Sequence, residues 1–124
     1  MENSKYRELL EERRKWYKKI GKVYCSILKE YVIFNSKGFY HLRYSGDRER
    51  TVKEQMYKIG LLPLVIPVIK NVEKIEEYRK ELSNGKEVEY WILKEVVGSQ
   101  NTMTKVILRR IGTGNITFYS VMKR

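Results

Sequence analysis

The sequence has few of the residue types on which several common kinds of site depend. Its 124 residues include one cysteine, one histidine and two prolines. The lone Cys25 excludes an internal disulfide, so we expect a reducing compartment. One histidine and one cysteine cannot supply the usual ligands of a zinc site, and Asp47 is the only aspartate. The glycine patterns of a P-loop or a dinucleotide site are missing as well. We therefore expect no metal ion and no cofactor.

Long apolar runs are also missing. The longest, residues 59–69, is interrupted by Gly60, Pro63 and Pro67 and is too short to cross a bilayer. The N-terminus is polar and charged, without the apolar core of a signal peptide. Together with the single cysteine, these features predict a cytoplasmic protein without a membrane partner.

Positive charge, in contrast, is in excess. The chain has 26 basic and 15 acidic residues, which gives a formal net charge of +11. The excess is spread through the chain, because residues 1–50 hold 13 basic and 7 acidic residues and the remainder hold 13 and 8. Such a charge indicates a polyanionic partner, nucleic acid first. Ten tyrosines add flat faces on which bases can stack. The alternative is a soluble protein that is merely basic.

Hydrophobic spacing predicts three helical segments. Apolar residues recur at helical spacing over residues 4–20, and Gly21 is a plausible stop. Thr51 followed by Glu54 has the spacing of a capping box, which predicts a short helix through residue 59. Residues 73–83 are also compatible with a helix that ends at an Asn-Gly pair. The stretch 61–70 fits either an extended run or a helix that begins at a proline.

Strand patterns occupy most of the remaining chain. Residues 22–34 contain β-leaning segments, residues 35–38 predict a turn, and residues 39–44 continue as an extended segment. Three strand-like runs follow at residues 88–97, 104–111 and 116–122, and their short connections predict an antiparallel meander. We therefore predict an α+β fold with N-terminal helices packed on a C-terminal antiparallel β-meander. The whole of residues 1–124 is expected to form one domain, with an N-terminal helix at 1–21 and a core at 22–124.

The C-terminal hairpin, residues 105–122, is the most informative segment. Its arms meet at a Gly-Thr-Gly-Asn turn. One arm carries Arg109 and Arg110, and the other carries Tyr119 and Ser120. Strand alternation places the two arginines on opposite faces, so at most one is expected in a site. The hairpin either binds a phosphodiester or is an ordinary sheet hairpin with a basic edge.

His41 is the only imidazole in the chain. In an extended segment it would share a face with Arg43. A histidine that moves protons beside an arginine that holds a phosphate would suit metal-free RNA cleavage. The alternative is a structural or half-exposed histidine. Arg48 and Arg50 lie in a nearby loop that can clamp phosphate, although its acidic neighbours favour a solvated loop.

Two of these segments carry a family resemblance. The segment Phe39-Tyr-His-Leu-Arg43 and the basic-then-aromatic hairpin resemble the phage-associated nuclease-like domains of the barnase–EndoU–colicin–RelE group. The resemblance is one of pattern and covers roughly residues 23–122. It implies a small α+β unit with helices on an antiparallel sheet. It also implies a metal-independent ribonuclease, of which many are toxins.

The resemblance also implies roles for particular residues. The candidate catalytic residues are His41, Arg43, Arg109, Arg110, Tyr119 and Ser120. The histidine would act as acid or base, the arginines as phosphate ligands, and the two hydroxyls as supporting donors. EndoU-type sites resemble a two-histidine arrangement, whereas RelE-type sites work largely with basic residues and tyrosine. The candidate nucleic-acid-binding residues are Lys105, Arg48, Arg50 and Lys70.

Three functions follow as expectations. The first is an endoribonuclease that cleaves RNA by 2′-hydroxyl attack, as a toxin or as a factor of a phage or mobile element. The second is a non-catalytic RNA- or DNA-binding domain that uses the same basic, tyrosine-rich surface. The third is an interaction module whose anionic partner is an acidic protein such as an antitoxin.

Overall fold

The computed structural model describes residues 4–123 and has an α+β architecture. The helices are α1 (Ser4–Ile20), α2 (Ser36–Arg43), α3 (Val52–Leu61) and α4 (Val65–Asn71), with a 3-10 turn, η1 (Leu62–Leu64), between the last two. The strands are β1 (Lys22–Cys25), β2 (Glu30–Ile33), β3 (Tyr44–Ser45), β4 (Arg48–Glu49), β5 (Glu77–Ser83), β6 (Lys86–Val97), β7 (Thr102–Ile111) and β8 (Ile116–Lys123). Helix α1 and the C-terminal strands thus form at the predicted places.

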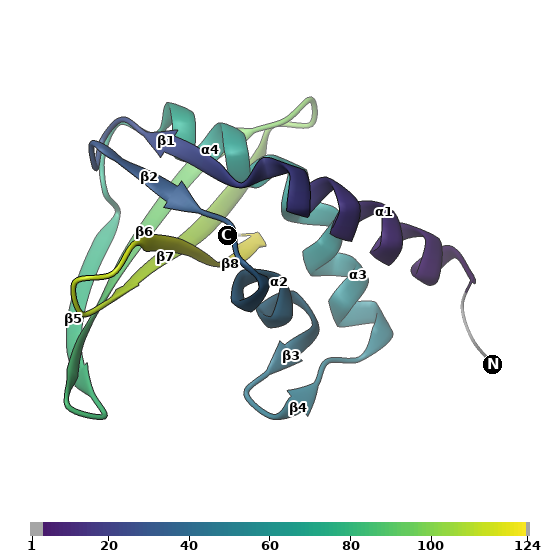
Figure 1. Cartoon of the computed structure of the whole chain (residues 1–124). Helices are drawn as coiled ribbons and strands as arrows, with labels where there is room; N and C mark the ends of the chain where they lie inside the picture. Colours follow the sequence, from purple (N-terminus) through teal and green to yellow (C-terminus); the bar gives the residue numbers. More distant parts are fainter. Residues whose placement is uncertain (1–3, 124) are drawn as a thin grey trace.

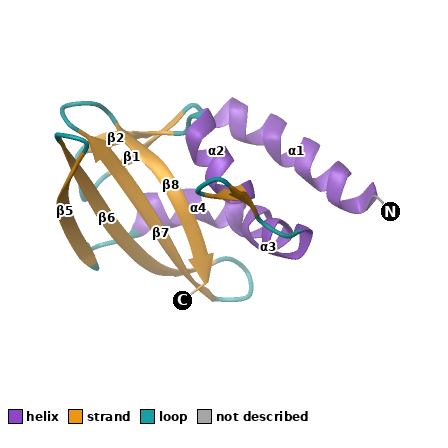
Figure 2. Cartoon of the chain, turned by 90° about the horizontal axis from the view of Figure 1, so that it is seen from below, coloured by secondary structure: helices purple, strands orange, loops and turns teal. Residues whose placement is uncertain are grey.

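Six of the strands form one mixed sheet. Its order is β1-β2-β8-β7-β6-β5. Strands β6 to β8 make the predicted antiparallel meander, β5 extends it by pairing antiparallel to β6, and β2 joins it by pairing parallel to β8. Helix α4 lies across one face of the sheet, while α1, α2 and α3 gather beside it (Figure 1; Figure 2). The small β3–β4 hairpin connects α2 to α3.

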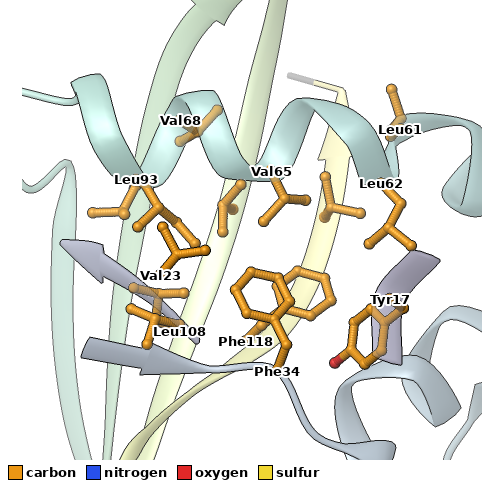
Figure 3. Packing of buried hydrophobic residues seen from close by; sticks show 14 of the residues in the cluster. Tyr17, Val23, Phe34, Leu61, Leu62, Val65, Val68, Leu93, Leu108 and Phe118 are labelled. Carbon is orange, nitrogen blue, oxygen red and sulfur yellow. The ribbon is translucent and has the colours of Figure 1, made fainter. Parts of the chain in front are cut away.

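Helix α4 provides the centre of the hydrophobic core. Val65 and Val68 of α4 belong to one core cluster with Leu93 and Leu108 of the sheet (Figure 3), and all four side chains are fully buried. Residues 61–70, whose pattern fits either an extended run or a helix, are therefore helical. Its second proline, Pro67, lies in the first turn of α4, where a backbone N–H has no partner within the helix.

The prediction of an extended segment at residues 39–44 was wrong. Residues 36–43 form α2 because Asn35 caps it: the Asn35 side chain accepts a hydrogen bond from the backbone N–H of Gly38. Phe39 and Leu42, three positions apart, are buried on one side of this helix. Residues two apart on a helix point about 200° from one another. His41 and Arg43 therefore do not share a face.

The prediction of a helix at residues 73–83 was also wrong. Residues 77–83 form β5, an edge strand on which every residue is exposed. Asn84 and Gly85, read as a helix stop, have φ angles of 51° and 77°. Two consecutive positive φ values are the signature of a tight hairpin turn, and this turn joins β5 to β6.

Helix α2 packs unusually close to β8, and Gly38 makes that approach possible. A β-carbon at this position would lie 2.7 Å from the carbonyl oxygen of Phe118 and 2.9 Å from its ring, and would also meet the Tyr17 hydroxyl. That hydroxyl donates a hydrogen bond to the carbonyl oxygen of Asn35 at 2.7 Å. The first turn of α2 is thus held between α1 and β8.

Replacing Gly38 by alanine should therefore force α2 away from β8. We expect Gly38→Ala to lower the free energy of unfolding by about 1–3 kcal/mol, the usual effect of overpacking, measured by urea denaturation. Gly60→Ala is the matched control, because a β-carbon there has no heavy atom within 4 Å. The control should be neutral or stabilise α3 by roughly 0.5–1 kcal/mol. Equal stability changes in the two variants would contradict the close packing at Gly38.

Candidate functional site

A hollow lies between the first turn of α2 and the β7–β8 hairpin. Its volume is about 360 Å³, and we call it the His41 hollow. Lys37, His41 and Arg109 line it together with polar side chains of the turn and strand. Within the described part of the chain, no acidic residue lines this hollow. The N-terminal end of α2 also faces it, which adds to the preference for an anion.

The Tyr119 ring brings His41 and Arg109 together. The centroid of the His41 imidazole lies 4.4 Å from the centroid of the Tyr119 ring. The guanidinium carbon of Arg109 lies 4.4 Å from the same centroid. Tyr119 occupies a β-bulge, because Phe118 pairs with Leu108 and Ser120 pairs with Ile107. Bulges redirect side chains out of the regular alternation, and here the bulge lies at the hollow.

Arg109 and Arg110 have opposite environments. The Nε atom of Arg109 is buried and has no hydrogen-bond partner among residues 4–123. Arg110, on the other face of β7, forms ion pairs at 3.1 Å with both Glu30 and Glu89. Arg109 lines the hollow and forms no ion pair among residues 4–123, so it is the arginine that is available for an external anion. The two arginines lie on opposite faces, as the alternation predicted.

The electrostatics of the hollow favour a neutral imidazole. Burial lowers the pKa of His41 below its ordinary value of 6.5, and the charges of Arg109, Arg50 and Lys37 lower it further. A neutral histidine at pH 7 can accept a proton. The guanidinium of Arg50 also donates a hydrogen bond to the backbone carbonyl of His41 at 3.2 Å, which holds this turn of α2 in place.

The other basic residues that the sequence predicts for the site lie outside the His41 hollow. The Arg43 guanidinium donates to Gln55 Oε1 at 3.2 Å and forms an ion pair with Glu49 at 3.6 Å. Arg48 forms an ion pair with Glu54 at 3.5 Å. Lys70 is exposed near the end of α4. Lys105 is placed on β7 opposite Met122 of β8, away from the hollow.

Ser120 is engaged by a lysine that the sequence analysis missed. Lys58 of α3 is buried and donates hydrogen bonds to Ser120 Oγ at 3.3 Å and to the Val121 carbonyl at 2.9 Å. Burial, and then the charge of Arg50, lowers the pKa of Lys58 to about 8. The available signal was helical spacing, because Gln55, Lys58 and Ile59 share the buried face of α3. Ser120 therefore supports the packing of α3 on β8 and does not line the hollow.

Two further findings concern the described residues as a whole. Within residues 4–123, no group of three or more His, Cys, Asp or Glu side chains is arranged to hold a metal ion. No helix in the same range is long and apolar enough to cross a membrane.

The contact between Arg109 and His41 can be tested by titration. Removing the arginine charge in Arg109→Gln relieves repulsion of the imidazolium, so the pKa of His41 should rise. It should remain below 6.5, because burial is the larger cause of its lowering. NMR titration reads this group without ambiguity, since the chain has one histidine.

Arg110→Gln is the control for this titration, since it makes the same change of charge on the opposite face of β7. The pKa of His41 should stay close to its wild-type value in that variant. An equal rise in both variants, or no rise with Arg109→Gln, would show that Arg109 does not act on His41.

Comparison with family models, curated proteins and solved structures found no match for this chain. The pattern-level resemblance to the nuclease-like group therefore has no support from these comparisons. A function is therefore inferred from the geometry and the charge of the His41 hollow.

Proposed function

We propose that this chain is a small, cytoplasmic, metal-independent endoribonuclease, acting as a toxin or as a phage-associated factor. The observation that carries the proposal is the arrangement around Tyr119. A histidine with a lowered pKa and an arginine that forms no ion pair among residues 4–123 both lie 4.4 Å from the centroid of this ring. Such a base and such a cation, in a hollow that no acidic residue of the described part of the chain lines, suit attack on a phosphodiester.

The proposed reaction uses four side chains in turn. Arg109 and Lys37 bind the non-bridging oxygens of one phosphate in the hollow. His41 takes the proton of the adjacent 2′-hydroxyl, and the 2′-oxygen attacks phosphorus. The bond from phosphorus to the 5′-oxygen breaks, and the Tyr119 hydroxyl donates a proton to that oxygen. The imidazolium then returns its proton to the tyrosinate. The products are a 2′,3′-cyclic phosphate and a 5′-hydroxyl.

A second function, RNA binding without cleavage, is favoured by a row of aromatic and basic side chains on the sheet. The Tyr90 ring lies 5.8 Å from the Tyr119 ring, and the guanidinium of Arg79 lies 5.6 Å from the Tyr90 ring. Tyr90 and Tyr119 are partly exposed. Such rows can stack successive bases while cations contact the backbone. The same surface suits an acidic inhibitor such as an antitoxin.

The decisive test is RNA cleavage in the presence of EDTA. Purified protein should cut single-stranded RNA to products with 2′,3′-cyclic phosphate ends, and should leave DNA of the same sequence intact. His41→Gln and Arg109→Gln should each lower the rate by about 100-fold or more, because general-base and charge-stabilising groups contribute on this scale. The rate should rise with pH to a plateau reached near neutral pH, since the pKa of His41 lies below 6.5.

Arg110→Gln is the matched control and should retain the wild-type rate, because Arg110 does not line the hollow. Preparing all variants identically excludes a contaminating ribonuclease. RNA that is bound but left intact by the wild type would replace this proposal with the binding function. If neither binding nor cleavage occurs and an acidic protein co-purifies, the interaction module is the better account.

A further inference from the structure

A second hollow lies between α1 and α2, on the other side of the first turn of α2. Its volume is about 390 Å³, and we call it the α1–α2 hollow. Asn35 and Ser36 line both this hollow and the His41 hollow. A chain molecule that occupies the His41 hollow can therefore place its neighbouring group in the α1–α2 hollow by passing over these two residues.

The walls of the α1–α2 hollow are largely aromatic. Phe34 and Phe39 line it from the core side, and Tyr40 of α2 and Tyr44 of β3 line it further along the chain. The rings of Tyr40 and Tyr44 are stacked, with centroids 4.5 Å apart and planes inclined by 12°. Flat aromatic surfaces in a hollow of this size favour a planar ring as ligand.

The charge of the α1–α2 hollow is positive. Arg14, Lys18 and Arg43 line it, and within residues 4–123 no acidic residue does so. Arg14 lies 3.8 Å from Glu11 and Arg43 lies 3.6 Å from Glu49, so part of this charge is compensated from outside the hollow. Arg14 and Lys18 lie one helical turn apart on α1. The Arg14 guanidinium lies 5.5 Å from the Phe39 ring, and that of Arg43 lies 5.6 Å from the Tyr44 ring. This combination fits a ligand that joins a planar ring to an anionic group.

We propose that the α1–α2 hollow binds the base of the nucleotide next to the phosphate in the His41 hollow. Arg14 and Lys18 then contact the phosphate on the far side of that nucleotide. The neighbouring positions of the two phosphates rest on the proposed function, whereas the recognition of a nucleotide by the α1–α2 hollow does not require cleavage. Helix α1 thereby becomes part of the RNA-binding surface.

Binding of single nucleotides tests the α1–α2 hollow directly. We expect the ribonucleoside 5′-monophosphates to bind about tenfold more tightly than ribose 5-phosphate, because stacking of the base adds this much affinity, measured by NMR titration. Arg14→Gln and Lys18→Gln should each weaken nucleotide binding, and Lys15→Gln, an exposed lysine of the same helix that does not line the hollow, should not. Equal binding of ribose 5-phosphate, or tighter binding of octanoate, would overturn the proposal.

Cleavage kinetics separate this proposal from the proposed function. With a short RNA substrate, Arg14→Gln should raise KM and leave kcat nearly unchanged, whereas His41→Gln should abolish turnover and leave mononucleotide binding intact. Nucleotide binding without any RNA cleavage would contradict the nuclease and support the base-binding hollow for a free nucleotide. RNA cleavage with an unchanged KM in Arg14→Gln and Lys18→Gln would overturn the base-binding hollow and leave the nuclease standing.

Discussion

The close contact of α2 with β8 at Gly38 determines where the candidate site lies. Because Gly38 has no side chain, the first turn of α2 can rest against the backbone of Phe118. The hydrogen bond from the Tyr17 hydroxyl to Asn35 fixes the same turn from the side of α1. His41 follows Gly38 by about one helical turn, so its position over the Tyr119 ring depends on this contact. A displaced α2 would separate His41 from Arg109 even with every residue of the site present.

Two adjacent arginines show how ion pairing decides which charge remains available. Arg110 is compensated by Glu30 and Glu89, and it links β7 to β2 and β6. Arg109 has no carboxylate partner among the described residues, and its charge instead lowers the pKa of His41. The same guanidinium thus favours a bound phosphate and adds to the effect of burial in favouring the neutral imidazole. Arg109 therefore contributes both to anion binding and, after burial, to the lowered pKa of His41.

Much of the fold followed from local patterns in the sequence. Helical spacing predicted α1, the pair Thr51 and Glu54 predicted the capping box that the structure contains, and alternation predicted the opposite faces of Arg109 and Arg110. Local patterns gave the wrong prediction where the same residues are compatible with two local structures. Residues 35–38 can form a turn or cap a helix, and only the tertiary burial of Phe39 and Leu42 favours the helix. The Asn-Gly pair at 84–85 can end a helix or make a hairpin.

The site itself was predictable only in part. His41, Arg109 and Tyr119 were candidates from their residue types, but their meeting depends on the packing of α2 on β8 and on the bulge at Tyr119. Neither is encoded in the spacing of nearby residues. The engagement of Arg43 by Glu49 and Gln55, and of Ser120 by Lys58, depends on the same long-range packing.

The most direct test of the central claim is the structure of a complex with a short RNA whose 2′-hydroxyls are methylated, so that attack on phosphorus is blocked. The account predicts one phosphate within hydrogen-bonding distance of the Arg109 guanidinium, with the adjacent 2′-oxygen facing the His41 imidazole. RNA phosphates bound only at the loop of Arg48 and Arg50, with none between His41 and Arg109, would contradict it.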